Sequence, residues 1–359
     1  MKKKLIALVV GAAAVMPAVA MADVTVYGRA HVSTDFLDDG ADYSETNISS
    51  NSSRLGFKGD HQINPNLKAF FQIEQQINFN TGESDGGENF ATRDTFVGVA
   101  GTNWGAVQLG RFDSPFKVAR GPANLFGDQV GDMRNLTRIG NARFDERYDN
   151  TVQYTTPSLG GFNIKLAYSI YEGQSRIVDE THPDYNEDSD AFSASLNYAA
   201  GPFEGSLAYE TAEENTGRGE RDGLRAAAAY KLTDAFKMVG FYQTVEYDDS
   251  DATTDQRDLW TADVYGLGGE FKFAPNTALK AMYMTRDADA DNADSDMWVV
   301  GIEHKLDKAV RVYANYAVVD NDDNVALTPW SQARSADPDD ADASGEKATG
   351  FTVGLRYDF

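Results

Sequence analysis

The chain contains no cysteine among its 359 residues. Without thiols it forms no disulfide, offers no cysteine nucleophile and holds no metal ion through sulfur. A fold of this size must therefore be stabilised by burial of apolar surface, or by a sheet that closes on itself and leaves no unpaired edge.

Long apolar runs are scarce as well. One lies at residues 5–15, after Lys2, Lys3 and Lys4 and before a small-residue cleavage motif at residues 20–22. It is shorter than the ~20 residues that a helix needs to span a bilayer. Residues 1–22 are therefore predicted to be a cleaved Sec-type export signal, and residues 23–359 a single domain. The mean hydropathy of −0.46 is low, but alternating strands of a membrane barrel also average out as hydrophilic.

Positive charge is the third scarcity. The chain has 32 Lys and Arg against 56 Asp and Glu, for a formal net charge of −24. This balance argues against nucleic acid as a partner, because its phosphates attract basic proteins. The acids gather in clusters, as at residues 287–296 and 337–342, where long loops are expected. A solvated charged surface is one interpretation of these clusters. Binding of Ca²⁺ or Mg²⁺ that bridges lipopolysaccharide phosphates is the other, although residues 287–296 lack the glycine and terminal glutamate of an EF-hand loop, so no metal ligand is assigned.

Two-residue alternation dominates the rest of the chain. In the first run Val24, Val26 and Val32 take one face, while Arg29 and His31 take the other, as in a strand with one apolar side. His31 is expected to be a solvated residue rather than a ligand or base. Sixteen such runs are predicted as strands: residues 24–36, 52–63, 67–79, 91–100, 105–112, 148–156, 161–171, 190–199, 203–211, 224–232, 236–247, 259–273, 278–286, 297–306, 310–319 and 347–359.

The connections between these runs alternate between a tight turn and a long, acidic loop. An antiparallel up-and-down barrel has this asymmetry when the turns lie at one rim and the loops at the other. The sequence therefore predicts an all-β fold, a sixteen-stranded antiparallel transmembrane β-barrel. Aromatic residues near run ends, such as Phe112, Phe203, Tyr247 and Phe273, suit the girdles of a membrane interface, although strands favour aromatic residues in any case.

The alternation breaks over residues 111–150. A structureless stretch of this length is uncommon in a compact domain unless it is functional or disordered. Phe116, Leu125, Phe126 and Leu136 lie in it, and this apolar content argues against disorder. The stretch is predicted to fold into the mouth of the barrel.

Several segments resemble Gram-negative general porins, in matching order and spacing along the chain. These segments are VTVYGRAHVSTDF, SSRLGFKGDHQINPNLKAFFQIEQ, RDTFVGVAGTNWGAVQLGRFDSPF, RYDNTVQYTTPSLGGF and the terminal GLRYDF. The resemblance implies an outer-membrane homotrimer, surrounded by lipid and lipopolysaccharide, that passes ions and small hydrophilic solutes passively and without a cofactor. It implies an inward-folded third extracellular loop at residues 113–147, here called the central segment. It also implies that Phe359 is the signal read by the barrel-insertion machinery.

The same resemblance implies a constriction in which basic residues on the barrel wall face acids on the loop. Arg29, Arg54 and Arg93 match the wall positions, and Glu74 shares their face. The further wall candidates are Arg143 and Arg147, and the loop acids are Asp113, Asp128 and Asp132. Such charges would sort ions across the narrowest point. The alternative is that the arginines pair with loop carboxylates only to brace the segment.

Leu125 departs from the family pattern, since it stands where the acidic loop tip is expected to carry a glutamate. With fewer loop acids, the wall arginines would bias the constriction toward anions. The acidic outer clusters would repel anions at the mouth. The two effects oppose one another, so the sequence leaves both signs of selectivity open.

Rival classes are an enzyme, a substrate-specific outer-membrane channel, and an adhesion or Ca²⁺-binding barrel. The sequence contains no H-E-x-x-H motif and no evident His-Ser-acid cluster, so it gives no support to an enzyme. A substrate-specific channel would be expected to line its lumen with a row of aromatic residues or with many charges of one sign. Neither pattern is evident in the sequence. A soluble exported sandwich used for adhesion would give no reason for alternating turns and long loops. The sequence therefore favours a diffusion channel.

Overall fold

The computed structural model describes residues 23–84, 90–139, 142–170, 190–213, 220–248, 253–330 and 343–359. The predicted export signal (residues 1–22) and the acidic cluster at residues 337–342 lie outside the described residues. No helix in the described ranges has the length and apolar character needed to cross a membrane.

One antiparallel sheet contains eighteen strands of the described chain. Two of them, β2 (Ser44–Ser50) and β5 (Glu83–Ser84), are short strands that pair with β1 and β4. The other sixteen close into a barrel, because β1 pairs with β3 along one edge and with β20 along the other. They are β1 (Asp23–Asp38), β3 (Arg54–Asn64), β4 (Leu67–Asn78), β6 (Thr95–Gly101), β7 (Gly105–Asp113), β10 (Arg147–Thr155), β11 (Phe162–Ile170), β12 (Asp190–Ala200), β13 (Phe203–Ala212), β14 (Glu220–Lys231), β15 (Phe236–Asp248), β16 (Ala262–Ala274), β17 (Thr277–Ala288), β18 (Ser295–Lys305), β19 (Val310–Asn321) and β20 (Lys347–Asp358).

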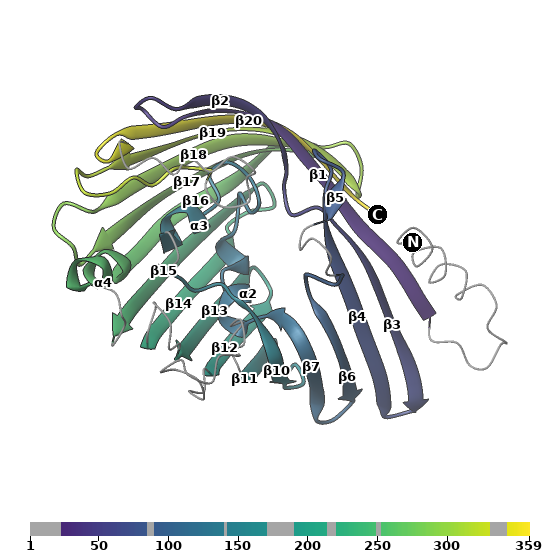
Figure 1. Cartoon of the computed structure of the whole chain (residues 1–359). Helices are drawn as coiled ribbons and strands as arrows, with labels where there is room; N and C mark the ends of the chain where they lie inside the picture. Colours follow the sequence, from purple (N-terminus) through teal and green to yellow (C-terminus); the bar gives the residue numbers. More distant parts are fainter. Residues whose placement is uncertain are drawn as a thin grey trace, which may run out of the picture.

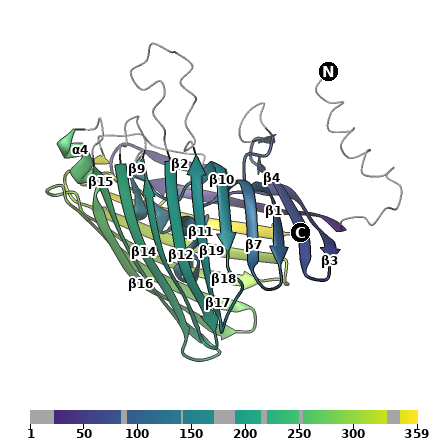
Figure 2. The same ribbon diagram turned by 90° about the horizontal axis from the view of Figure 1, so that it is seen from below.

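The predicted sixteen-stranded barrel is confirmed. Figure 2 shows the tight turns at one rim and α4 (Thr254–Trp260) at the other. The two faces of each strand differ as the alternation predicted. On β14, for example, Leu224 is exposed on the outer face, while Arg225 and Ala227 are buried on the inner face. An apolar outer face is what a barrel in lipid requires.

Three local predictions are wrong. Residues 91–94 precede β6 rather than belong to it, because Gln75 Oε1 accepts hydrogen bonds from the backbone N–H groups of residues 91 and 92. Leu259 and Trp260 end α4 rather than begin a strand, since Thr253 and Gln256 form a capping box at the start of this helix. The cluster at residues 287–296 does not form a long loop, because β17 and β18 extend into it.

Three side chains also differ from expectation. Phe112 and Tyr247 are buried rather than exposed in a girdle. His31 is not solvated: its side chain is fully buried, and its Nε2 lies 2.8 Å from the hydroxyl oxygen of Tyr313. Tyr247 packs on Phe144 of the central segment and on Trp260 of α4. Phe112 packs on Phe96 of β6, and His31 contacts Tyr313 of β19. Alternation along a single strand cannot reveal such neighbours.

The interior is filled mainly by the central segment. Figure 1 shows its helices α2 (Pro115–Val118) and α3 (Arg134–Thr137) within the curve of the sheet. The segment also contains the 3₁₀ turn η1 (Gly121–Ala123) and the two-residue strands β8 (Arg138–Ile139) and β9 (Ala142–Arg143). Its apolar residues form common cores with inner-face residues of β1 and of β13 to β20. The apolar residues of the central segment were predicted to pack against another part of the chain. They do so by burying their side chains against the inner face of the barrel.

Candidate functional site

Inward-facing glycines leave the space in which the central segment lies. A Cβ atom at Gly223 of β14 would lie 3.1 Å from the Phe116 ring. At Gly268 of β16 it would lie 3.1 Å from Leu125 Cδ1, and at Gly301 of β18 it would lie 3.0 Å from Phe126 Cε1. The segment follows the inner wall across these strands. Leu125 therefore serves as an apolar anchor in this chain.

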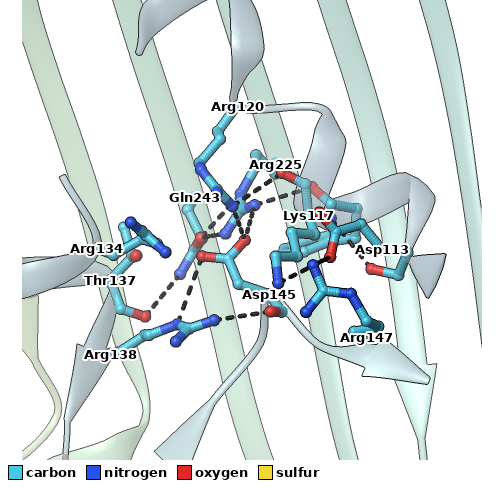
Figure 3. A network of polar contacts seen from close by, with 12 residues as sticks. Asp113, Lys117, Arg120, Arg134, Thr137, Arg138, Asp145, Arg147, Arg225 and Gln243 are labelled. Carbon is cyan, nitrogen blue, oxygen red and sulfur yellow. Dashed lines mark hydrogen bonds and ion pairs between the residues drawn. The ribbon is translucent and has the colours of Figure 1, made fainter. Parts of the chain in front are cut away.

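The root of the central segment is held by a buried charge network (Figure 3). Asp145 pairs with Arg225 of β14 and with Arg120, whose Nη1 is 3.0 Å away, and Arg138 Nε lies at 3.7 Å. Arg225 also donates to the carbonyl oxygen of Phe116 at 2.8 Å and to Gln243. Burial alone would raise the pKa of Asp145, but the three guanidinium groups hold it well below its usual range.

A second network joins the start of the segment to β10. Asp113 accepts from Arg147 Nη2 at 2.7 Å and pairs with Lys117 Nζ at 3.0 Å. Arg147 also pairs with Asp94, which precedes β6. Asp113 and Arg147, predicted on opposite sides of a constriction, therefore bind each other. Burial lowers the pKa of Lys117 to about 8, against the opposing effect of Asp113.

The tip of the segment reaches the first strand. Asp128 Oδ2 lies 3.6 Å from Arg29 Nη1, and Asp128 Oδ1 accepts from Ser52 Oγ at 3.1 Å and from Arg134 Nη2 at 2.8 Å. Burial alone would raise the pKa of Asp128, but the nearby arginines, Arg134 first, hold it well below its usual range. Asp132 is fully buried and binds Arg134 at 2.6 Å instead of facing the wall.

The remaining predicted wall residues gather around one carboxylate. Glu74 accepts from Arg93 Nε at 2.6 Å and from the Tyr27 hydroxyl at 2.9 Å, and Arg54 Nε lies 3.7 Å from it. Arg29 completes the row and binds Asp358 at 2.8 Å. The structure thus brings Arg29, Arg54, Arg93 and Glu74 together. Arg143 lies on β9, and its side chain is outside the described residues.

The family model described as Gram-negative porin matches residues 7–324. This chain belongs to the Gram-negative porin family. The porin is 30% identical to outer membrane porin protein 32 of Delftia acidovorans over 100% of both chains. It is 31% identical to the major outer membrane protein P.IB of Neisseria meningitidis serogroup B over 56% of this chain and 57% of that protein. The solved anion-selective porin from Comamonas acidovorans superposes with a TM-score of 0.76 at 24% identity, covering 94% of this chain and 100% of that one.

Membership in this family makes the protein an outer-membrane diffusion channel and agrees with its apolar outer face. No three His, Asp or Glu side chains of the described ranges are grouped as ligands of a metal ion.

Sequence reasoning missed a second row of charges on the porin wall, on β17 to β20. Lys280 Nζ lies 2.9 Å from Glu303, Arg311 Nη1 lies 3.8 Å from the same carboxylate, and Arg356 binds Asp358 at 2.8 Å. These charged residues alternate with apolar residues along β17 to β20, so the sequence pattern could have revealed them. Arg134, Arg120 and Arg225 were missed for another reason, because their role depends on how the central segment folds.

Proposed function

We propose that the central segment narrows this channel and that the constriction favours small anions over cations. The observation that carries the proposal is the contact between Asp128 on the segment and Arg29 on β1. It brings the tip of the segment to the wall row of Arg54 and Arg93. A solute that passes beside this contact meets side chains from both the segment and the wall.

The two rows of charged wall residues described above contain six cationic groups and three carboxylates, and this excess of positive charge favours anions. Arg54 and Arg93 share the single carboxylate of Glu74. Asp132 and Asp128 both bind Arg134, so the segment supplies a cation next to its own acids. Guanidinium groups stay charged at any working pH. The resulting positive potential in a narrow, low-dielectric passage would raise the local concentration of anions.

Two further points bear on the sign of selectivity. The structural neighbour from Comamonas acidovorans is described as anion-selective, which supports the same sign here. The net charge of −24 acts in the opposite direction. Its effect is weaker, because exposed charges more than about 8 Å from the ion path are largely screened at physiological ionic strength. Bracing of the segment by the same arginines is compatible with this role.

The oligomeric state and the binding partners of the porin belong to the same proposal. The porin would assemble as a homotrimer in contact with outer-membrane lipid and lipopolysaccharide, with no cofactor, no nucleic acid and no catalytic activity. Phe359 would be read by the barrel-insertion machinery, and its exposed ring on the outer face is accessible for this. Its backbone N–H donates to the carbonyl oxygen of Gly28 at 3.0 Å, so recognition would come before the last strand closes on β1.

Planar-bilayer recording of the detergent-purified porin under a KCl gradient tests this function. We expect conductance steps that arrive in threes, and a reversal potential whose sign shows that chloride is more permeant than potassium. Steps that arrive singly would contradict the trimer. A reversal potential of the opposite sign would show that the acidic clusters, rather than the wall arginines, set selectivity.

Alkaline pH is expected to weaken the anion preference through Lys117. Its pKa of about 8 means that its charge is lost as the pH rises from 7 to 9, while Arg120, Arg138 and Arg147 around it stay charged. The reversal potential should therefore move toward cations over this range, and the variant Lys117→Met should show a flat profile. An equal shift in the variant would assign the titration to another group.

A further inference from the structure

The connection that follows β19 also enters the barrel. Residues 321–330, here called the strap, carry Val325, Leu327 and Trp330, and all three side chains are buried. Trp330 heads the large side chains that the described residues bury almost completely. The three belong to the same apolar core as Val130 and Met133 of the central segment. The strap therefore packs against the tip of the segment, far from the root held by Asp145.

Directed contacts reinforce this packing. The carbonyl oxygen of Pro329 accepts two hydrogen bonds from the tip, one from the backbone N–H of Gly131 at 2.7 Å and one from Asn135 Nδ2 at 2.6 Å. Val130 and Trp330 meet over Gly350 of β20, where a Cβ atom would lie 2.8 Å from Val130 Cγ1 and 3.6 Å from Trp330 Cε3. A Cβ atom at position 350 would therefore displace Val130 and would only contact the Trp330 ring.

The strap is itself fixed to the wall. Asn321 Nδ2 donates to the carbonyl oxygen of Leu327 at 2.9 Å, and Asn321 Oδ1 accepts from the Leu327 N–H at 3.1 Å and from Ser295 Oγ at 2.8 Å. Asn324 Nδ2 donates to the carbonyl oxygen of Asp291, in the connection between β17 and β18, at 2.7 Å. The strap is thus bonded to the barrel by contacts that do not involve the central segment.

The backbone at the tip allows little adjustment. Gly131 has a φ of +86°, a value that favours glycine, and a Cβ atom there would lie 2.5 Å from Val299 Cγ1. Asp128 and Gly131 are three residues apart, so the bond to Pro329 limits where the Asp128 carboxylate can lie. The tip is held on one side by Arg29 and Ser52 and on the other by the strap.

We propose that the strap is a positioning element of the channel: it holds the tip of the central segment so that Asp128 stays beside Arg29. The role rests on the proposed function of the segment as the constriction. If the contacts between the strap and the tip are lost, the tip moves and the passage widens. The Asp128 carboxylate then no longer offsets the charge of Arg29. A connection at the loop rim thereby controls pore width and selectivity through the segment it supports.

Two variants test the strap. Trp330→Ala removes the buried ring, and Asn135→Leu removes one donor to Pro329 while keeping a side chain of similar size. Trp298→Ala is the matched control, because Trp298 is exposed on the outer face. Heat-modifiable migration in gels selects folded protein. In bilayers we expect both variants to show conductance raised roughly 1.5-fold, noisier open states and a shifted reversal potential, while the control is unchanged.

Asp128→Asn, measured in parallel, separates the possible failures. A folded Trp330→Ala or Asn135→Leu porin with native conductance and reversal potential would overturn the strap proposal if Asp128→Asn does shift the reversal potential. If Trp330→Ala, Asn135→Leu and Asp128→Asn all have no effect, the central segment is not the constriction. If Trp330→Ala fails to fold, Asn135→Leu decides, since it removes no apolar side chain from the core.

Discussion

The triple variant Arg29→Gln, Arg54→Gln and Arg93→Gln is expected to reverse the ion preference of the channel from anions to cations. Three positive charges leave the wall, while Glu74 and Asp358 lose cationic partners at 2.6 and 2.8 Å. Unit charges 4 Å apart interact with about 1 to 4 kcal/mol at effective dielectric constants of roughly 80 to 20. A change of about tenfold in the permeability ratio needs only about 1.4 kcal/mol.

Reversal potentials under a KCl gradient, recorded at two salt concentrations, measure this effect. Arg257→Gln on α4 is the control, because it replaces one arginine in the same way at the rim, away from the wall row. Selectivity that stays unchanged in the folded triple variant would show that the three arginines only brace the central segment. An equal shift in the control would point to surface charge as the cause.

Asp145→Ala is expected to cause the largest loss of stability at a single site. Its carboxylate is the common partner of Arg225, Arg120 and Arg138, and both it and Arg225 are almost completely buried. Removing one partner of a buried ion pair leaves an uncompensated charge and costs about 3–5 kcal/mol. We expect a lower temperature for the heat-modifiable transition in detergent, and a central segment that proteases cleave faster.

Asp149→Ala provides the comparison. Asp149 pairs with Arg111, but the two side chains are 41% and 37% exposed, and exposed pairs contribute only about 0–1 kcal/mol. A transition temperature as low as that of Asp145→Ala would mean that burial of the network is not what matters. A normal transition for Asp145→Ala would show that the root of the segment is held by apolar packing around Phe116 and Phe144 instead.

The barrel was predictable from the sequence because the pattern of apolar and polar residues along each strand shows which face is the outer one. Alternation along Leu224, Arg225, Ala226 and Ala227 already separates the outer face from the inner one. The wrongly predicted strand boundaries lie where a side-chain hydrogen bond or a helix cap replaces the strand structure that the two-residue alternation predicts. At residues 91–94 the Gln75 side chain takes the backbone N–H groups, and at residues 254–260 a capped helix interrupts the loop.

The site was predictable in part. The wall row of Arg29, Arg54 and Arg93 followed from alternation together with the family resemblance, and the structure does place these side chains around Glu74 and the segment tip. The pairing of the loop acids did not follow. Lys117 and Arg134 lie four and two residues from Asp113 and Asp132, and they reach those acids before any wall residue can.

The sequence by itself determined the strand pattern, the alternation of turns and loops, the absence of thiol chemistry and the polar inner face, because all of these are local or compositional properties. Only the tertiary structure decided which charges meet. Arg225 and Asp145 are 80 residues apart, and Pro329 and Asn135 are 194 apart. Such contacts depend on the path that the central segment and the strap take across the closed barrel, which is set by inward glycines and apolar packing on many strands at once.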